Sequence, residues 1–527
     1  MAHVGQVIDR SALHIGGTVP RARTWAAIGG GGTLGGTWRG FMRGAYEGGL
    51  TPRRGTPPAM KASVRFSTIL LAALAAACGG GGKPTTTGTT PVAPLPPDAK
   101  PPVEPPPAVE EGPTAEAALA WVLEGIASGQ VTEADVEAHF SPGFLKQVPA
   151  AQAVQIFGAL HEQLPPTKIL KQEGEAPLKL SALLDTASGG VRVDLVMTKS
   201  MPRQIDGLLF KPASAEAPPK TYGDAVAQLD KAGSKNQLFV AELVKGKCEP
   251  RQNHNTTQSL AIGSTFKLWV LLALDEKLHA DKKLSWDTKL AIRDAAKSLP
   301  SGTMQDEAAG TEHTLREFAT QMISISDNTA TDHLIDYVGD AAVEKALKLA
   351  KHGNPAANIP FLRTRELFGL KLAATADELA AYRKAKAPAK RKVLADMRAR
   401  PIDVEKAIKE WGDTPRALDL EWFADGRDLC NVMATLGARA KFDPESELLK
   451  VLGKNPGVEI DRAKWTYAGF KGGSEPGVMN LTWLLRRADG KWFVVVVAVN
   501  DETHKLDEGL VANAAQGVVA ILGNEAP

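Results

Sequence analysis

Ser264 and Lys267 lie three residues apart in the segment Gly-Ser264-Thr-Phe-Lys267 and are the residues best suited to chemistry. The segment opens a nearly unbroken apolar run from Phe266 to Leu274, which is typical of a buried helix. Residues three apart share a helix face, so Lys267 reaches back to Ser264. Burial favours the neutral amine, which can take the serine proton. The pair predicts a nucleophile and its base, although this spacing alone also occurs by chance, as a helix N-cap beside a surface lysine.

A second polar group, Ser326-Asp327-Asn328, lies between two helices expected at Leu315–Ile323 and Thr329–Val338. Ser326 can relay a proton between the nucleophile, the lysine and a leaving nitrogen. Asn328 can hydrogen-bond a substrate amide. A plain helix N-cap at this segment is compatible with that function.

A third group, Lys471-Gly472-Gly473-Ser474, precedes two strands expected at Val478–Arg486 and Trp492–Val499, joined by an Asp-Gly turn. We expect Lys471 to end a strand at a glycine-rich bend, where its ammonium binds a substrate carboxylate. The backbone N–H groups of Ser474 and Ser264 would form a two-donor oxyanion hole.

The order Ser-x-x-Lys, Ser-Asp-Asn, Lys-x-Gly resembles that of the class A β-lactamases and other penicillin-recognising serine hydrolases. The resemblance covers about residues 221–527. It implies a β-lactamase/transpeptidase-like domain of mixed α+β and α/β class, in which helices flank an antiparallel sheet. It also implies an acyl-enzyme on Ser264 without a metal or cofactor. The chain most resembles β-lactamase-related lipoproteins that carry a small N-terminal domain.

Two features depart from the family pattern. Gly472 replaces the threonine of Lys-Thr-Gly, and Ser474 is the candidate to supply the missing hydroxyl. The family's efficient β-lactamases also carry a glutamate that activates the deacylating water. Glu366 is the candidate here, although its pairing with Arg365 is equally typical of a surface ion pair. The following segment, Ala373–Trp411, is an enlargement that we expect to form solvated helices.

Three functions remain open on these motifs. The first is a hydrolase that opens a β-lactam, ester or amide through acylated Ser264. The second is a D,D-peptidase acting on peptidoglycan stem peptides. The third is a penicillin-binding protein with little or no turnover.

The pattern of the N-terminal region predicts an export signal and a membrane anchor. Residues 60–78 have a basic start, an apolar middle and small residues before Cys78, as in a signal peptide. Ala-Ala-Ala-Cys78 resembles a bacterial lipobox, which implies a lipidated Cys78 and a membrane-anchored protein of the cell envelope, facing the periplasm or exterior; an unmodified cysteine is the alternative. We expect residues 1–59 to be a non-native upstream extension and residues 79–113, rich in Pro, Gly and Thr, to be a tether.

Residues 114–212 predict a separate small α+β domain. Apolar residues at helical spacing indicate helices at Ala115–Ser128 and Ala150–Leu164. Four strand-like runs follow, at Lys168–Gln172, Leu178–Leu184, Val191–Met197 and Ile205–Phe210. The order resembles the cystatin/steroid-isomerase-like (NTF2-like) fold. We expect docking or substrate positioning from this domain, because its His139 and His161 stand alone; residues 213–220 then form a linker.

Composition narrows the partners. The net charge of +2 gives no reason to expect nucleic acid binding, and we expect a monomer. The ten histidines form no HxH or HExxH pair, and three cysteines are too few for a zinc knuckle, so a metal-dependent hydrolase is not expected. Cys248 and Cys430 lie in the exported part, where a disulfide can form; the sequence leaves their pairing open.

Overall fold

The computed structural model describes residues 112–526 except 147, 165–166, 187–188, 300, 404–410 and 413. It also describes two short strands, β1 (Val7–Ile8) and β2 (Ala73–Leu74), which pair in parallel. The predicted extension, signal peptide and tether otherwise lie outside the described residues, as does the predicted lipidation site Cys78. Among the described helices, none is both long and apolar enough to span a membrane.

The small domain consists of helices followed by an antiparallel meander. Its helices are α1 (Ala115–Ser128), α2 (Glu133–His139), α3 (Pro142–Leu145) and α4 (Ala150–Gln163). Its strands pair in the order β3 (Lys168–Glu175), β4 (Lys179–Thr186), β5 (Gly189–Met197) and β6 (Ile205–Pro212). The two predicted helices and four predicted strands are confirmed, whereas α2 and α3 are too short to show a periodic pattern. The likeness to the cystatin/steroid-isomerase-like fold stays a prediction.

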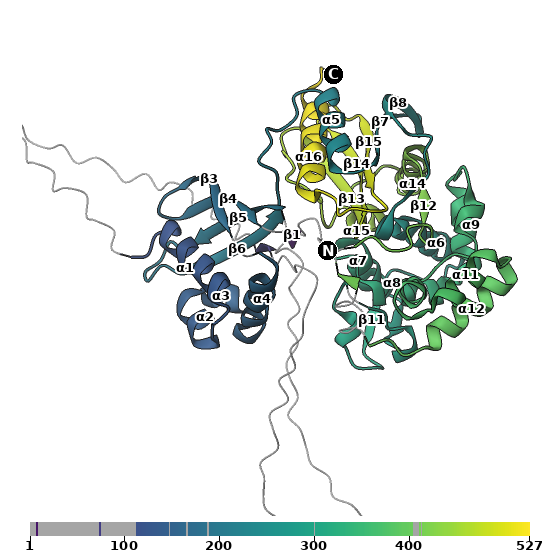
Figure 1. Cartoon of the computed structure of the whole chain (residues 1–527). Helices are drawn as coiled ribbons and strands as arrows, with labels where there is room; N and C mark the ends of the chain where they lie inside the picture. Colours follow the sequence, from purple (N-terminus) through teal and green to yellow (C-terminus); the bar gives the residue numbers. More distant parts are fainter. Residues whose placement is uncertain are drawn as a thin grey trace, which may run out of the picture. The chain divides into compact units, whose positions relative to one another are not determined.

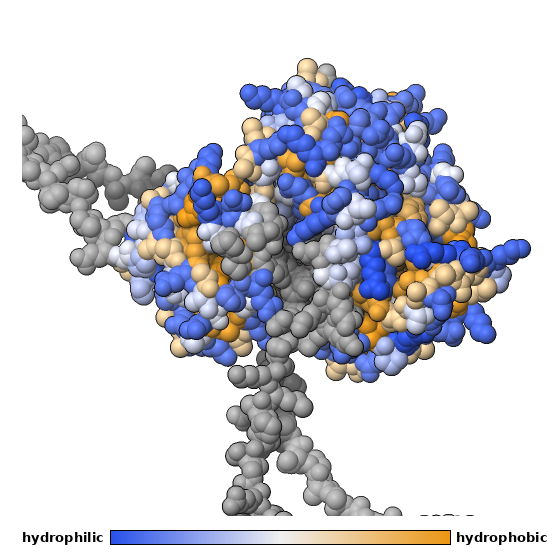
Figure 2. All heavy atoms as spheres, viewed as in Figure 1, coloured by the Kyte–Doolittle hydropathy of each residue, from blue (hydrophilic) through white to orange (hydrophobic). Residues whose placement is uncertain are grey.

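Apolar side chains from α1 and α4 pack on one face of this sheet. Val122, Phe157, Leu184 and Val193 belong to one buried cluster. Other hydrophobic residues reach the surface of the domain (Figure 2), where Ile169, Leu170 and Met201 are between 43% and 55% exposed. Its two histidines have structural partners. The ring of His139 stacks on Trp121, and His161 Nδ1 contacts the carbonyl of Ile126.

The larger domain is built on a five-stranded antiparallel sheet. Its strands are ordered β13 (Trp465–Glu475), β14 (Val478–Arg487), β15 (Trp492–Asn500), β7 (Lys235–Val244) and β8 (Lys247–His254). The sheet thus joins strands from both ends of the domain. Strands β14 and β15 confirm the predicted hairpin.

Helices cover both faces of this sheet. Successive residues of a strand point to opposite faces, and here the residues on both faces are apolar. On β15, Val495 and Val497 pack with α5 (Tyr222–Ala232) and α16 (Glu508–Asn524) (Figure 1). Val494 and Val496 face the opposite way, into the cluster that contains α6 (Lys267–Ala280) and α14 (Gly426–Arg439).

The remaining elements form the helical part of the domain. Helix α6 lies at its centre, and each residue from Phe266 to Leu274 is at most 1% exposed, which confirms the predicted buried helix. The helices around it are α7 (Leu315–Ser324), α8 (Asn328–Val338), α9 (Asp340–Leu349), α10 (Thr364–Phe368), α11 (Ala376–Lys384), α12 (Ala387–Ala399) and α15 (Glu447–Leu452). Short strands and turns connect them: β9 (Leu260–Ala261), η2 (Gly263–Phe266), β10 (Lys289–Ala291), η3 (Asp294–Ala296), η4 (Met304–Asp306), β11 (Glu312–Thr314), η5 (Pro355–Asn358), η6 (Gly369–Ala373) and β12 (Phe423–Ala424). Helices α11 and α12 confirm the helical prediction for the enlarged segment.

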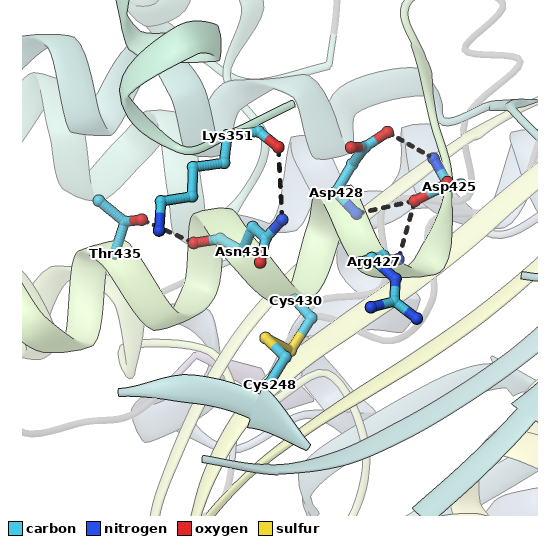
Figure 3. Close-up of a disulfide and its surroundings, with 8 residues drawn as sticks. All are labelled: Cys248, Lys351, Asp425, Arg427, Asp428, Cys430, Asn431 and Thr435. Atoms are coloured by element: carbon cyan, nitrogen blue, oxygen red, sulfur yellow. Dashed lines mark hydrogen bonds between the residues drawn. A yellow bond between two sulfur atoms is a disulfide. The ribbon is translucent and has the colours of Figure 1, made fainter. Parts of the chain in front are cut away.

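A disulfide bond joins Cys248 on β8 to Cys430 on α14, so the pairing that the sequence left open is present (Figure 3). The two cysteines are 182 residues apart. Asp425 caps the start of the same helix, accepting hydrogen bonds from the backbone N–H groups of Arg427 and Asp428. The bond therefore ties the edge strand of the sheet to a capped, buried helix.

Removing this disulfide is expected to lower the stability of the domain. The doubly substituted protein Cys248→Ala/Cys430→Ala should lose about 2–5 kcal/mol of unfolding free energy, because the crosslink restricts a long loop of the unfolded chain. Guanidinium denaturation under non-reducing conditions measures the loss. Wild-type protein treated with a reductant serves as the control and should approach the variant. A variant with the midpoint of the oxidised wild type would contradict the prediction.

Candidate active site

Ser264 lies on the turn η2, between strand β9 and helix α6. The sequence predicts it at the first turn of the helix, whereas the structure places it in a 3-10 turn directly before α6. Neighbouring backbone fixes this turn. Ile262 N–H donates to the carbonyl of Trp422 at 3.0 Å, and the Asn500 side chain hydrogen-bonds both backbone groups of Ala261. The Ser264 side chain is half-buried, which leaves it accessible on a rigid support.

Lys267 begins α6 and is fully buried. Its Nζ lies 2.6 Å from the carbonyl oxygen of Ser326, 3.0 Å from Ser326 Oγ and 2.7 Å from Asn328 Oδ1. The amide nitrogen of Asn328 donates to the carbonyl of Leu299 at 3.1 Å, which orients its oxygen toward the lysine. The structure thus brings Lys267, Ser326 and Asn328 into direct contact.

The environment of Lys267 favours its neutral form. Burial lowers its pKa to about 7, and Asp327 and Asp332 oppose the shift only in part. A neutral amine has two N–H donors and one lone pair. The donors match the two acceptors that carry no proton, namely Ser326 O and Asn328 Oδ1. Ser326 Oγ is the remaining contact of Nζ, at 3.0 Å.

This pKa leads to a prediction about pH. The rate constant for acylation of Ser264 should fall about tenfold per unit as the pH drops below about 7, because protonated Lys267 has no lone pair to accept a proton. Stopped-flow kinetics with a chromogenic cephalosporin between about pH 5 and pH 8.5 measures this limb. A rate constant independent of pH across this range would contradict a basic role for Lys267.

Ser326 occupies a strained position between α7 and α8. Its φ is +59°, a left-handed conformation that non-glycine residues seldom adopt. The next residue holds the turn, because the buried carboxylate of Asp327 accepts hydrogen bonds from the N–H groups of Thr303, Met304 and Ala330. The Ser326 carbonyl also accepts a hydrogen bond from Ser301 Oγ at 2.7 Å. The Ser-Asp-Asn segment therefore caps α8 while its serine and asparagine contact Lys267.

Lys471 also contacts Ser326. Its Nζ donates to Ser326 Oγ at 3.1 Å and to the carbonyl of Gly472. Burial lowers its pKa well below the usual range, and nearby Lys267 lowers it further. The expectation that a strand ends at Lys471 is wrong. Strand β13 continues to Glu475, because the glycines pair in register with β14, Gly473 opposite Asn480.

Strand β13 contacts η2 through its glycines. A Cβ built on Gly473 would lie 2.5 Å from Ser264 N, and one built on Gly263 would lie 3.0 Å from Ser474 N. The backbone nitrogens of Ser264 and Ser474 thus border one close contact between the turn and the strand. The side chain of Ser474 is half-buried. A two-donor oxyanion hole formed by these N–H groups stays a prediction.

Glu366 lies in a different environment from the predicted surface pair with Arg365. It is 3% exposed and caps α10, where Oε2 accepts the backbone N–H of Arg363 at 2.8 Å. Its other oxygen pairs with Arg398 at 3.2 Å, while the Arg365 guanidinium donates to backbone carbonyls. Burial raises the pKa of Glu366 to about 7, against the effects of the Arg363 N–H and of Arg398. Among the described residues, its hydrogen-bond and ion-pair partners do not include Ser264, Lys267 or Ser326.

Thr364 and Asp332 are buried next to Asn328, and the sequence analysis missed both of them. Thr364 Oγ1 lies 2.8 Å from Asp332 Oδ1 and 3.3 Å from the carbonyl of Asn328. Asp332 also accepts the backbone N–H groups of Thr364 and Arg365. The available signal was the spacing of Asp332, four residues after Asn328 and hence on the same face of α8.

Comparisons with known proteins agree with this architecture. Residues 222–391 match the beta-lactamase enzyme family, and residues 111–199 match the family described as the N-terminal part of the ORF 12 gene product. A search of the curated proteins finds no match. The larger domain thus has a β-lactamase/transpeptidase-like fold, and its residues 222–391 are similar to the beta-lactamase enzyme family.

Solved structures with detectable similarity include three of this kind. A beta-lactamase from Sphaerobacter thermophilus is 22% identical, with 58% of this chain and 98% of that one covered and a TM-score of 0.40. A point mutant of PBP-A, as an acyl-enzyme complex with penicillin G, is 16% identical, with coverages of 59% and 100% and a TM-score of 0.38. A class A beta-lactamase representative from Bacteroides cellulosilyticus is 17% identical, with coverages of 59% and 100% and a TM-score of 0.38.

Proposed function

We propose that this protein is an acylating serine hydrolase that opens β-lactams, or related esters and amides, through an ester on Ser264. The observation that carries the proposal is the neutral-amine environment of Lys267, whose Nζ contacts Ser326 Oγ directly, one helical turn from the half-buried nucleophile. No metal or organic cofactor enters the reaction.

The proposed acylation step uses each of these groups once. Ser264 Oγ attacks the carbonyl carbon while its proton passes to Lys267 Nζ. The N–H groups of Ser264 and Ser474 stabilise the oxyanion that forms. Collapse of this intermediate breaks the carbon–nitrogen bond, and the proton moves from Lys267 through Ser326 to the leaving nitrogen. The products are the ester on Ser264 and a neutral amine whose N–H carries the proton that left Ser264.

Lys471 supports an anionic substrate. It is buried, and the described contacts of its Nζ are a hydroxyl and a carbonyl, neither of which neutralises a positive charge. A substrate carboxylate placed beside Lys471 would supply the neutralising negative charge and raise the lowered pKa of the lysine. β-Lactams and peptidoglycan stem peptides both carry such a carboxylate, so the D,D-peptidase alternative uses the same contact.

A penicillin-binding function with little turnover is the second candidate, and the position of Glu366 favours it. Deacylation requires a base that activates water beside the ester. The carboxylate of Glu366 is instead occupied by the Arg363 N–H and Arg398. The loop side chain that contacts the Ser-Asp-Asn segment is that of Thr364, which carries no basic group. We therefore propose an acyl-enzyme that forms readily and hydrolyses slowly.

A time course of intact mass with a panel of β-lactams tests both steps. We expect a mass increase of one β-lactam molecule on Ser264 within minutes and its persistence over about an hour or longer. Ser264→Ala should abolish the adduct, whereas the control Ser474→Ala keeps the nucleophile and should still form it. Rapid release of hydrolysed β-lactam would favour efficient turnover, and release of terminal D-Ala from a stem-peptide substrate would favour the peptidase. An adduct on the Ser264→Ala protein would refute the assignment of Ser264 as the nucleophile.

A further inference from the structure

A buried charged cluster lies beside the candidate active site and has no part in the proposed chemistry. Lys371 on η6 is 0% exposed, and its Nζ contacts carboxylate oxygens of Glu421, at 2.8 Å, and of Glu475. The indole of Trp411 lies against the same ammonium, 5.9 Å from ring centroid to Nζ. Burying three ionisable side chains lowers stability unless each of them has a close ion-pair or hydrogen-bond partner.

The two carboxylates belong to two segments that adjoin the candidate oxyanion hole. Glu475 is the last residue of β13 and directly follows Ser474, one donor of the hole. Glu421 directly precedes Trp422, whose carbonyl accepts the Ile262 N–H and whose ring stacks on Phe266 of η2 at a centroid distance of 3.7 Å. Phe266 belongs to the turn that carries Ser264, the other donor.

Lys371 connects the segments of Glu421 and Glu475 to the loop that follows Ser-Asp-Asn. It is seven residues after Thr364, the loop residue that contacts Asn328 and Asp332. A single ammonium therefore connects three segments: the end of β13, the residues Glu421 and Trp422, of which Trp422 packs on η2, and this loop. We propose that Lys371, Glu421 and Glu475 form a latch that positions the two N–H donors of the oxyanion hole and couples them to the loop carrying Thr364. The positional part rests on the structure, and its effect on acylation rests on the proposed function.

The charge of the cluster gives this latch a dependence on pH. One ammonium and two carboxylates sum to one uncompensated negative charge, and a single proton neutralises the cluster. Burial raises the pKa of Glu475 well above its usual range, and neighbouring Glu421 adds to this, against the effect of Lys371. Asp419 is also near Lys371, but its side chain is 54% exposed, so solvent screens its charge. Since the proton is lost as the pH rises, the latch should loosen at alkaline pH.

Hydrogen exchange of wild-type protein and Glu475→Gln tests this inference without relying on catalysis. In the wild type, the protection factor of the segment 472–478, corrected for intrinsic exchange, should fall about tenfold between about pH 6 and pH 9. Gln at 475 mimics the protonated acid and leaves Lys371 with Glu421, so its protection should stay within about threefold. Arg383→Met breaks the nearby surface pair with Asp419 and should follow the wild type. Unchanged wild-type protection, or a Glu475→Gln profile that follows the wild type, would overturn the latch.

Lys371→Met provides the second measurement. It should lower the protection of 472–478 and of 364–373 about tenfold at both pH values, and it should slow acylation of Ser264 by a similar factor. Arg383→Met should change neither quantity more than about twofold. If the wild type is never acylated, the proposed function fails while the exchange data still decide the latch. If the wild type is acylated and Lys371→Met behaves as Arg383→Met does in both measurements, the latch fails.

Discussion

Lys267→Met is expected to reduce the rate constant for acylation of Ser264 by about 10²–10⁴, the usual contribution of a general base. Methionine is similar in length and fills the buried space, but it has no lone pair basic enough to accept the serine proton. In the wild type Nζ lies 3.0 Å from Ser326 Oγ. Pre-steady-state kinetics with a chromogenic cephalosporin measures the change.

Lys277→Met is the matched control, because it makes the same substitution on the same helix. Lys277 is half-buried, and its ammonium lies 5.0 Å from the centre of the Tyr337 ring, among residues that take no part in the proposed chemistry. This variant should acylate at nearly the wild-type rate. Thermal unfolding of both proteins separates the loss of a base from the loss of the fold. A folded Lys267→Met protein that acylates at the wild-type rate would exclude Lys267 as the base.

The placement of the candidate site residues was largely predictable from local sequence. Ser264 and Lys267 are close in the chain, and the apolar run after Phe266 leaves α6 no face toward solvent. Ser326 and Asn328 flank a helix start that Asp327 caps, so local capping rules already place them on a turn. Lys471 precedes a hairpin with a strong turn signal. In each case the information lies within about one element of the residue itself.

The environment of Glu366 was not predictable in this way. Its neighbour Arg365 suggested an exposed pair, but adjacent residues of a helix point in different directions. Arg365 turns to the carbonyls of Lys297 and Arg398, and Glu366 turns inward to cap its own helix. Which way each side chain points is decided by α8 and α12, elements that come from distant parts of the chain.

The cluster of Lys371 was hidden for a related reason. Its members are 50 and 104 residues from Lys371, and none lies in a motif. A lysine and two glutamates at such separations are normally read as surface residues. Only the tertiary arrangement, which brings η6, the residue before Trp422 and the end of β13 together, removes them from water.

Gly473→Ala is expected to abolish efficient acylation, with a loss of at least about 10²–10³ in rate constant, the cost of losing one oxyanion donor. A Cβ at this position would lie 2.1 Å from Ile262 O, 2.5 Å from Ser264 N and 2.6 Å from Thr265 N. All three atoms belong to the backbone, so no side-chain rotation relieves the contact. Strand and turn must separate, and the N–H groups of Ser264 and Ser474 then no longer converge on one oxygen.

Gly472→Ala distinguishes this effect from a general sensitivity of the strand. A Cβ at Gly472 would meet Phe470 Cζ at 2.8 Å, the far end of a side chain that is able to move. We expect the control to acylate within about fivefold of the wild type, since the backbone of η2 stays in place. Intact-mass labelling and circular dichroism should be measured on both proteins. A folded Gly473→Ala protein that acylates as fast as Gly472→Ala would show that the contact of β13 with η2 does not form the oxyanion hole, and Ser264 would then require other donors.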